Sequence, residues 1–312
     1  MRIIFCNIGA HQRWRRIENH MNKTLSSIRN DLSFITFCEM YFYKGGKAMN
    51  SPWIGIIHDP PETQKFDRSK NIFKNSRFVS SLKHCKHLFT MSDASTQWAI
   101  KNLSDKGSGY INIKVDTLRH PLPDMNSQFD MKKYESNKEK SIIQIGNWLR
   151  KTYAIYFLKL PDSQTLPYKF TKKICPWSNR MSQELQQSCS RDKVKVSPHT
   201  KASVKHLQKL SDADYTKMFE ANIIFLELYA STVNNVVLEA IKANTPILIN
   251  RLSSVEEYLG KDYPLLYDDR EQIGILLSDE SNIVKAHEYL SNMDKSVLSL
   301  DYFTESIKKF LR

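Results

Sequence analysis

Short apolar segments alternate with segments of helical periodicity along most of the chain. The apolar runs are rich in Ile, Val and Phe, and between the first two of them Ile17, Met21, Leu25 and Ile28 recur at helical spacing. Such alternation is typical of parallel strands joined by crossover helices. It therefore predicts an α/β protein built from doubly wound parallel sheets. The strands predicted in the first half cover 2–7, 34–38, 53–57 and 87–90, and a helix capped by Ser92 runs to about residue 103.

The length of the chain favours two domains, because 312 residues exceed the usual size of a single hydrophobic core. Residues 123–140 lose apolar periodicity and are rich in Pro, Asn, Ser and charge, so we interpret them as a linker. We predict an N-terminal domain over 1–122 and a second domain over 141–295. A C-terminal helix over 296–312 carries Phe303, Ile307 and Leu311 on one face and can pack back on the first domain.

The second half repeats the pattern of the first. Predicted strands cover 141–145, 168–174, 204–210, 222–226 and 246–250, and predicted helices cover 153–158, 212–220 and 234–243. The stretch 177–202 mixes Ser, Gln and Lys and is interpreted as a surface excursion. The sequence thus predicts two Rossmann-like sheets connected in series.

Cysteine usage and hydropathy suggest a cytoplasmic protein. The 5 cysteines are odd in number, scattered and never at metal-ligand spacing, which fits reduced thiols and predicts no structural zinc. The apolar run at the start is too short for a signal peptide, and no segment reaches the roughly 18 to 20 apolar residues that cross a bilayer. We expect a cytoplasmic protein, with the cytosolic face of a membrane left open.

The formal net charge of +13 favours anionic partners. Nucleotide phosphates, nucleic acid and acidic lipid headgroups all qualify, so peripheral contact with an anionic membrane stays open. A Lys- and Asn-rich composition can also arise from coding bias. The charge alone therefore does not choose a function.

The most informative stretch runs from 231 to 246 and lies between two predicted strands. Its helix, predicted to begin at Asn234, places Asn235 and Glu239 four residues apart on one face, with Ser231 and Thr232 just before it. Free amides at a helix start bind phosphate groups, and a carboxylate one turn further in can accept hydrogen bonds from a ribose. An ordinary amphipathic helix with a polar start would show the same pattern.

A second candidate site follows the strand that ends near Ile145. Gly146 permits a tight turn, and Arg150 or Lys151 can neutralise a diphosphate as negative charge develops on it. In the N-terminal half, His58 and Asp59 end an apolar strand, at the edge where open α/β sheets bind ligands. Gly9 and His11 follow the first strand and are the acceptor-side candidates by the same argument.

These segments together resemble the GT-B glycosyltransferases of the family-4-like group, also called glycosyl transferases group 1. The resemblance lies in Glu239 and Ala240, in the turn from Ala243 to Pro246, and in the strand after it. It continues into the segments 255–260 and 262–265 and back to the glycine turn, where Lys151 fits the family's lysine. It implies two Rossmann-like domains facing a cleft, the nucleotide-sugar donor on the C-terminal one, and Glu239 on the donor ribose.

Three positions depart from the family pattern. Ser231 stands where the family often has a second glutamate, eight positions before Glu239. Asn244 replaces the turn glycine, and Asn147 replaces an arginine directly after Gly146. The missing carboxylate leaves the donor sugar and the stereochemistry open.

We therefore predict a glycosyltransferase that moves a sugar from a nucleotide-sugar donor to a hydroxyl of a glycan or glycoconjugate. Gly146, Arg150, Lys151, Ser231, Asn234, Asn235 and Glu239 would bind the donor, and His58 and Asp59 would be catalytic. His58 can accept a proton from the acceptor hydroxyl or hydrogen-bond the sugar. We expect no metal or cofactor, because helix ends and cations can neutralise the leaving group. The alternatives are a nucleotide-sugar epimerase of the same fold and a basic nucleic-acid-binding protein without catalytic activity.

Overall fold

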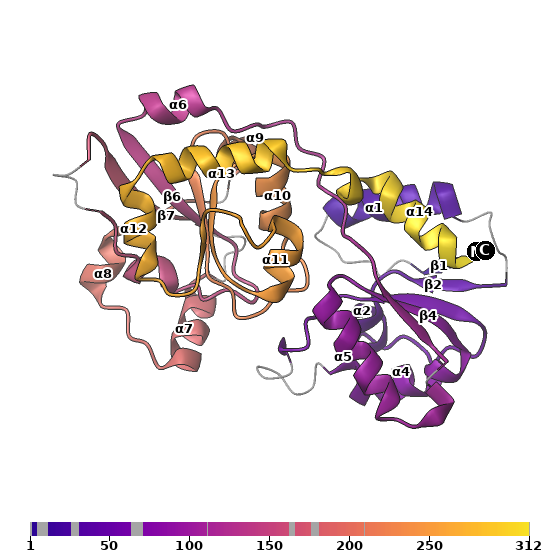
Figure 1. Ribbon diagram of the computed structural model, residues 1–312. Helices are drawn as coiled ribbons and strands as arrows, with labels where there is room; N and C mark the ends of the chain where they lie inside the picture. Colours follow the sequence, from indigo (N-terminus) through magenta and orange to yellow (C-terminus); the bar gives the residue numbers. More distant parts are fainter. Residues whose placement is uncertain are drawn as a thin grey trace. The chain divides into compact units, whose positions relative to one another are not determined.

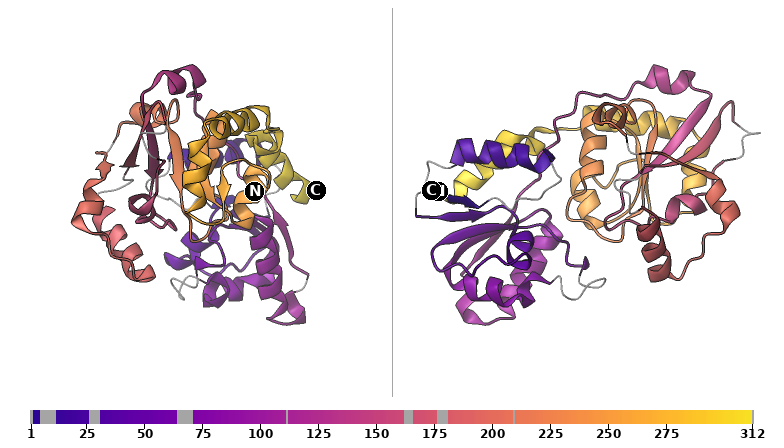
Figure 2. Two further views of the ribbon diagram at one scale, coloured as in Figure 1. Left: turned by 60° about the vertical axis from the view of Figure 1, so that its left-hand side comes forward. Right: turned by 180° about the vertical axis from the view of Figure 1, so that it is seen from behind.

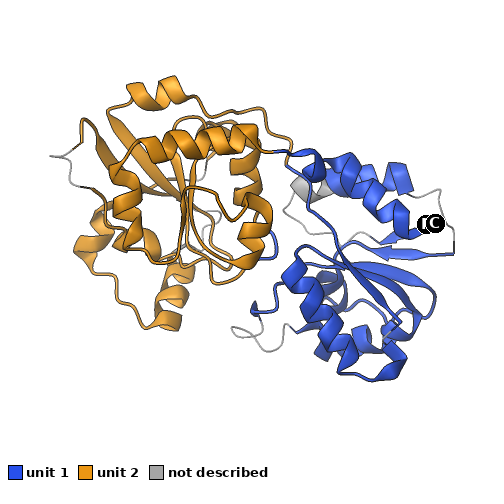
Figure 3. Cartoon of the chain, in the orientation of Figure 1, with its two compact units in different colours: residues 1–122, 231–233, 294–312 blue, residues 123–230, 234–293 orange. Residues whose placement is uncertain are grey.

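The computed structural model describes residues 2–4, 12–25, 31–63, 71–110, 112–161, 166–175, 181–208 and 210–311. The chain forms two compact units, which Figure 3 distinguishes by colour. Unit 1 comprises residues 1–122, 231–233 and 294–312, and unit 2 comprises residues 123–230 and 234–293. None of the helices in the described ranges is both long enough and apolar enough to cross a membrane.

Unit 1 contains a parallel sheet whose five strands follow one another in chain order. The strands are β1 (Arg2–Ile4), β2 (Ser33–Ile35), β3 (Trp53–Ile57), β4 (Cys85–Thr90) and β5 (Lys114–Thr117). The sequence did not predict β5, because its four residues are exposed or half-buried and form no apolar run. An edge strand that is paired on one side needs no continuous apolar sequence.

Helices cover both faces of this sheet, as Figures 1 and 2 show. On one face α1 (Gln12–Leu25) and α14 (Leu300–Leu311) pack against Phe34, Ile54 and Ile56. On the other face α2 (Cys38–Tyr43), α4 (Ser76–Ser81) and α5 (Asp93–Ser104) pack against Ile35, Trp53 and Ile57. Neighbouring residues of one strand thus enter opposite cores, as the two-residue period of a strand requires. The short 3₁₀ turns of the unit are η2 (Ile72–Lys74), η3 (Leu82–His84), η4 (Ser108–Tyr110) and η6 (Ser296–Leu298).

The C-terminal helix α14 belongs to unit 1. Its residues Phe303, Ile307 and Leu311 are buried in one cluster with Ile17 and Met21 of α1. The apolar face seen in the sequence is therefore a core face. At the start of α5, Ser92 caps the helix and accepts a hydrogen bond from the backbone N–H of Ser95.

Unit 2 contains a parallel sheet of six strands in the order β11-β10-β9-β6-β7-β8. They are β6 (Glu139–Ile145), β7 (Lys169–Cys175), β8 (Val204–His206), β9 (Ile223–Leu226), β10 (Ile247–Asn250) and β11 (Leu266–Tyr267). The first strand, β6, lies in the middle and pairs with β7 on one side and β9 on the other. The strand order therefore reverses between β6 and β9, which is the arrangement of a Rossmann fold.

The helices of unit 2 differ in length from those expected. The predicted helix at 153–158 is a single 3₁₀ turn, η5 (Ala154–Phe157), whereas the predicted surface excursion contains α7 (Met181–Asp192) with Leu185 buried. The others are α6 (Met131–Ser136), α8 (Pro198–Ala202), α9 (Asp212–Lys217), α10 (Asn235–Ala243), α11 (Ser253–Leu259), α12 (Gln272–Ser278) and α13 (Ser281–Asn292).

Residues 123–140, interpreted from the sequence as a linker, fold as part of unit 2. They contain α6 and the first residues of β6. Phe129 and Tyr134 are buried, and the fully buried Lys140 donates to Glu280 at 2.6 Å. The segment has too few apolar residues to show a period, so its packing was invisible in the sequence.

Asn244 ends α10 in the left-handed conformation, with a φ of 56°. Its backbone N–H bonds back to the carbonyls of Ala240 and Ile241. Asparagine tolerates this conformation better than other residues with a Cβ, so it can replace the glycine that usually ends a helix.

Candidate functional site

The candidate donor site lies at the carboxyl edge of the sheet in unit 2. The polar segments begin where strands end: Gly146 after β6, Glu227 after β9 and Asp268 after β11. In open α/β sheets ligands bind at this edge, next to the point where the strand order reverses. That point is the gap between the ends of β6 and β9.

Gly146 turns the chain sharply after β6. Its φ is +73°, and a Cβ placed on it would meet the Arg150 guanidinium at 3.0 Å. A larger residue would therefore be strained in its backbone and would require the Arg150 side chain to shift slightly. The turn returns the chain alongside β9, where Arg150 forms an antiparallel bridge with Leu228.

This bridge sends the side chains of Arg150 and Lys151 in opposite directions. Two backbone hydrogen bonds flank it, from Lys151 N to Glu227 O at 2.8 Å and from Tyr229 N to Leu149 O at 2.9 Å. In extended backbone, successive side chains alternate between the two sides. The two cations that the sequence placed in one phosphate site therefore have different neighbours.

Arg150 turns toward the start of α10. Its Nη2 donates to the Asn234 Oδ1 at 3.1 Å, and the same oxygen caps the helix by accepting from Val236 N at 3.0 Å. Burial lowers the pKa of Arg150 to about 10, which leaves the guanidinium charged at neutral pH. Asn235, in the first helical turn, is exposed.

Glu239 lies one turn further along α10 and is buried, with 1% of its surface exposed. Its Oε2 accepts a hydrogen bond of 2.6 Å from the hydroxyl of Tyr215 on α9. Tyr215 lies in the helix predicted over 212–220, but the sequence did not connect it to Glu239. Gly146, Arg150, Asn234 and Glu239 thus come together around the start of α10 in unit 2.

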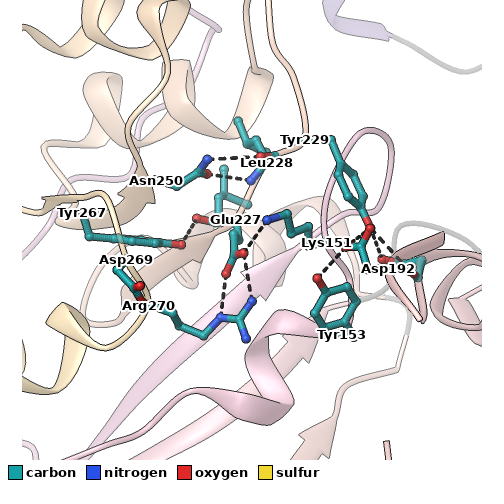
Figure 4. A network of polar contacts seen from close by, with 12 residues as sticks. Lys151, Tyr153, Asp192, Glu227, Leu228, Tyr229, Asn250, Tyr267, Asp269 and Arg270 are labelled. Carbon is teal, nitrogen blue, oxygen red and sulfur yellow. Dashed lines mark hydrogen bonds and ion pairs between the residues drawn. The ribbon is translucent and has the colours of Figure 1, made fainter. Parts of the chain in front are cut away.

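Lys151 turns instead into a network centred on Glu227, shown in Figure 4. The Lys151 Nζ donates a hydrogen bond to the Glu227 Oε1 at 2.9 Å. Arg270 reaches the same carboxylate with two bonds, Nε to Oε2 at 2.7 Å and Nη2 to Oε1 at 2.9 Å. The sequence singled out neither Glu227 nor Arg270, because they are 43 positions apart and meet only through the sheet.

Hydrogen-bonding side chains from neighbouring strands surround Glu227. The Asn250 side chain accepts a hydrogen bond from Leu228 N at 2.7 Å and donates one to Leu228 O at 3.1 Å. Its amide therefore pairs with the Leu228 backbone as the backbone of a neighbouring strand would. Tyr267 donates its hydroxyl to Leu226 O at 3.0 Å. Burial tends to raise the pKa of Glu227, but the bonds from Arg270 and Lys151 lower it below its ordinary value. Glu227 is therefore an ionised carboxylate held by two cations.

The network forms part of the wall of a pocket of about 590 Å³. All its lining residues belong to unit 2: Lys151, Tyr153, Phe157, Lys159, Val194, Glu227, Asp268, Asp269, Arg270 and Glu271. Arg150, Asn234 and Glu239 are not among them. The structure therefore separates the predicted donor residues into a group around α10 and a group around Glu227.

In unit 1, His58 follows β3 and is half-buried. Its ring lies 4.0 Å from that of Phe37, and its Nε2 lies 2.9 Å from the carbonyl oxygen of Thr36. A carbonyl only accepts, so Nε2 carries the proton in this contact. Burial lowers the pKa of His58 to about 3, which keeps the ring neutral at neutral pH.

The backbone at His58 and Asp59 is held by Glu39, a residue that the sequence did not indicate. The Glu39 Oε1 accepts from His58 N at 2.9 Å and from Asp59 N at 2.8 Å. Ser231 belongs by its contacts to unit 1, where the neighbouring Thr232 donates its hydroxyl to the His58 carbonyl at 2.7 Å. Gly9 and His11 lie outside the described residues.

No metal-binding cluster of three or more His, Cys, Asp or Glu side chains occurs within the described ranges. The four cysteines of those ranges, Cys38, Cys85, Cys175 and Cys189, form no disulfide with one another.

Two parallel sheets with helices on both faces, the second with a Rossmann strand order, define the GT-B fold, and solved structures of this fold match nearly the whole chain. The apo structure of OtsA has a TM-score of 0.62 at 11% identity and covers 96% of this chain and 76% of that chain. A UDP-forming alpha,alpha-trehalose-phosphate synthase from Burkholderia vietnamiensis has a TM-score of 0.56 at 10% identity, covering 96% and 77%. A structure described as trehalose-6-phosphate from E. coli bound with UDP-2-fluoro glucose has a TM-score of 0.59 at 12% identity, covering 96% and 77%.

No protein-family model matches the sequence, and no curated protein sequence matches it significantly. At identities of 10 to 12% the structural likeness shows the fold alone. The predicted α/β fold with two Rossmann-like parallel sheets is confirmed.

Proposed function

We propose that this chain is a glycosyltransferase that moves a sugar from a nucleotide-sugar donor to a hydroxyl of a glycan or glycoconjugate. One observation carries the proposal. The glycine turn after β6 and the start of α10, which are the two segments of the family resemblance, are joined by the bond from Arg150 to Asn234 at 3.1 Å. They join at the strand edge where a Rossmann sheet binds nucleotides.

In this proposal the donor binds along the edge from Gly146 to α10. Arg150 and the free amides at the start of α10, with Ser231, Asn234 and Asn235 nearby in the chain, would neutralise the phosphates. Glu239 would accept hydrogen bonds from the ribose. In the structure the Tyr215 hydroxyl donates a hydrogen bond to the Glu239 carboxylate. Donor binding would replace this hydrogen bond with hydrogen bonds from the ribose hydroxyls.

On the acceptor side, the neutral ring of His58 would hydrogen-bond the transferred sugar or the acceptor hydroxyl, because a pKa of about 3 disfavours its protonation. Asp59 follows it directly, and Glu39 holds the backbone of both. Gly9 and His11 remain acceptor-side candidates. We also propose that transfer needs no metal, since positive side chains and a helix start supply the charge that a metal would bring.

The main test of the function is donor binding by Glu239→Gln. The unmodified protein should bind at least one member of a panel of UDP-, GDP- and ADP-sugars in calorimetry. Glu239→Gln should weaken that binding by at least about tenfold, because an amide accepts at only one of its two positions. If the unmodified protein binds no member of the panel, or if the variant binds equally well, the proposal is wrong.

Glu220→Gln is the matched control. Glu220 is a carboxylate of the same unit whose ion-pair partner is Lys133 of α6, at 2.7 Å. Its substitution should leave donor affinity unchanged. Thermal unfolding of both variants shows whether either one is misfolded.

A further inference from the structure

The family pattern has an arginine directly after the glycine, and this chain has Asn147 at that position. A diphosphate bound at the strand edge would therefore lack one of its two usual cations. Arg270 follows β11, far along the chain, and lies beside Lys151 because both bond the carboxylate of Glu227. The two side chains share the Oε1 atom, at 2.9 Å from each nitrogen.

Both cations are held in place on more than one side. The backbone bridge beside Lys151 fixes its side chain on the Glu227 side, and the Tyr229 ring lies 5.8 Å from its Nζ. The Arg270 guanidinium is bound to Glu227 through two nitrogens and lies 5.7 Å from the Tyr153 ring. Asp192 accepts from the hydroxyls of both tyrosines and so fixes the two rings.

The two cations keep unused donors and face the pocket. An ammonium has three donors and a guanidinium has five, and in the described part of the chain Glu227 takes one from Lys151 and two from Arg270. Their side chains are 30% and 25% exposed, whereas that of Glu227 is 7% exposed. The three side chains together therefore carry a net positive charge, and the two cations are more exposed than the carboxylate between them.

The other three carboxylates of the pocket, Asp268, Asp269 and Glu271, also have ion-pair or hydrogen-bond partners. Asp268 pairs with Arg251 at 3.4 Å, and Glu271 pairs with Lys159 at 3.3 Å. Asp269 accepts from the backbone N–H of Glu271 at 2.9 Å. The pocket is therefore of mixed charge, and anion binding within it depends on the paired cations.

We propose that Lys151 and Arg270 together bind a phosphate group, with Arg270 supplying the cation that Asn147 does not. We name the set of Lys151, Arg270 and Glu227 the phosphate clamp. Glu227 is its positioning residue. The inference rests on the proposed transferase function, in which the phosphate belongs to the donor diphosphate or to a phosphorylated acceptor.

The test compares two ligands. Arg270→Gln and Arg270→Lys are titrated by calorimetry with UDP and, separately, with a hexose 6-phosphate. Charge-assisted bonds to phosphate are strong, and Arg binds it through two nitrogens. Arg270→Gln should weaken binding at least about tenfold for the ligand whose phosphate occupies the clamp, and Arg270→Lys should weaken it less.

Lys159→Gln is the matched control, because it removes one positive charge from the same pocket but not from the clamp. Its side chain is 76% exposed and pairs only with Glu271 among the described residues. It should leave both affinities unchanged. If Lys159→Gln loses as much affinity as Arg270→Gln does, the effect is one of general charge and the clamp is overturned.

The outcomes separate the two proposals. A loss for UDP assigns the clamp to the donor, and a loss for the hexose 6-phosphate alone assigns it to a phosphorylated acceptor. Unchanged affinity for both ligands in Arg270→Gln overturns the clamp, even if Glu239→Gln still weakens UDP binding. If the unmodified protein binds neither ligand, the clamp is overturned, whereas the transferase is overturned only if no member of the nucleotide-sugar panel binds.

Discussion

The two units each bury a glutamate at the carboxyl ends of parallel strands, but the two carboxylates have different partners. In unit 2, Glu227 is bound by Lys151 and by Arg270. In unit 1, Glu39 accepts backbone N–H groups of His58 and Asp59. Both residues are almost completely buried, at 6% and 2% exposure.

Their pKa values move in opposite directions. Burial raises the pKa of Glu39, the nearby Asp59 raises it further, and backbone hydrogen bonds only partly oppose them. For Glu227 burial acts in the same direction, but two cations outweigh it and lower the pKa. At Glu227 the two cations outweigh burial, whereas at Glu39 the backbone donors do not outweigh burial and the charge of Asp59.

The largest expected effect is that of Glu227→Ala on the stability of unit 2. The variant leaves Lys151 and Arg270 without their carboxylate, and breaking a buried pair from one side is costly. Because both cations are partly exposed, we expect the free energy of unfolding to fall by about 2 kcal/mol. Denaturant unfolding at pH 7 measures it. Glu271→Ala, which breaks the exposed pair with Lys159, should cost below about 0.5 kcal/mol.

The loss of unfolding free energy in Glu227→Ala should depend on pH. A carboxylate whose folded pKa is lowered stabilises the protein above its unfolded pKa, and the contribution disappears as the pH falls through the folded pKa. The difference between the unmodified protein and Glu227→Ala should therefore be largest at neutral pH and shrink below about pH 4.5. A difference that grows on acidification would show that Glu227 is not held as an ionised carboxylate.

Glu39→Gln should have a smaller effect, on unit 1. The amide keeps an oxygen for His58 N and Asp59 N but brings an NH₂ group close to them. We expect a loss of about 1 kcal/mol at pH 4, measured by denaturant unfolding.

The pH dependence of Glu39→Gln should be the reverse of that of Glu227→Ala. A carboxyl whose folded pKa is raised contributes fully below the unfolded pKa, and its contribution is lost as the pH rises through the folded pKa. The cost of the substitution should therefore shrink from pH 4 toward neutrality. If it grows instead, Glu39 is ionised and the contrast between the two units fails.

Lys151→Met should have the smallest effect on stability. Arg270 keeps its two bonds to Glu227, and the Lys151 side chain is 30% exposed. We expect a loss below about 0.5 kcal/mol, measured at pH 7 beside Glu227→Ala. A loss as large as that of Glu227→Ala would mean that Lys151 alone neutralises the carboxylate.

The predicted strands and helices show how much the sequence reveals. Apolar runs located β3 and β9 within a residue of their observed ends, because strands buried on both faces need continuous apolar sequence. The same reasoning missed β5, which lies at an edge, and the packing of Phe129 and Tyr134. Those segments are held by contacts distant in the chain, which leave no local period.

For the candidate site, the sequence by itself determined the Gly146 turn, the start of α10 and the order in which they occur, because turns and helix starts need particular residues locally. Only the tertiary structure decided that Arg150 and Lys151 point apart, that Tyr215 bonds Glu239, and that Arg270 joins Lys151 on Glu227. The spacing of charges along a chain does not say which cation meets which carboxylate. That pairing depends on which strands lie side by side.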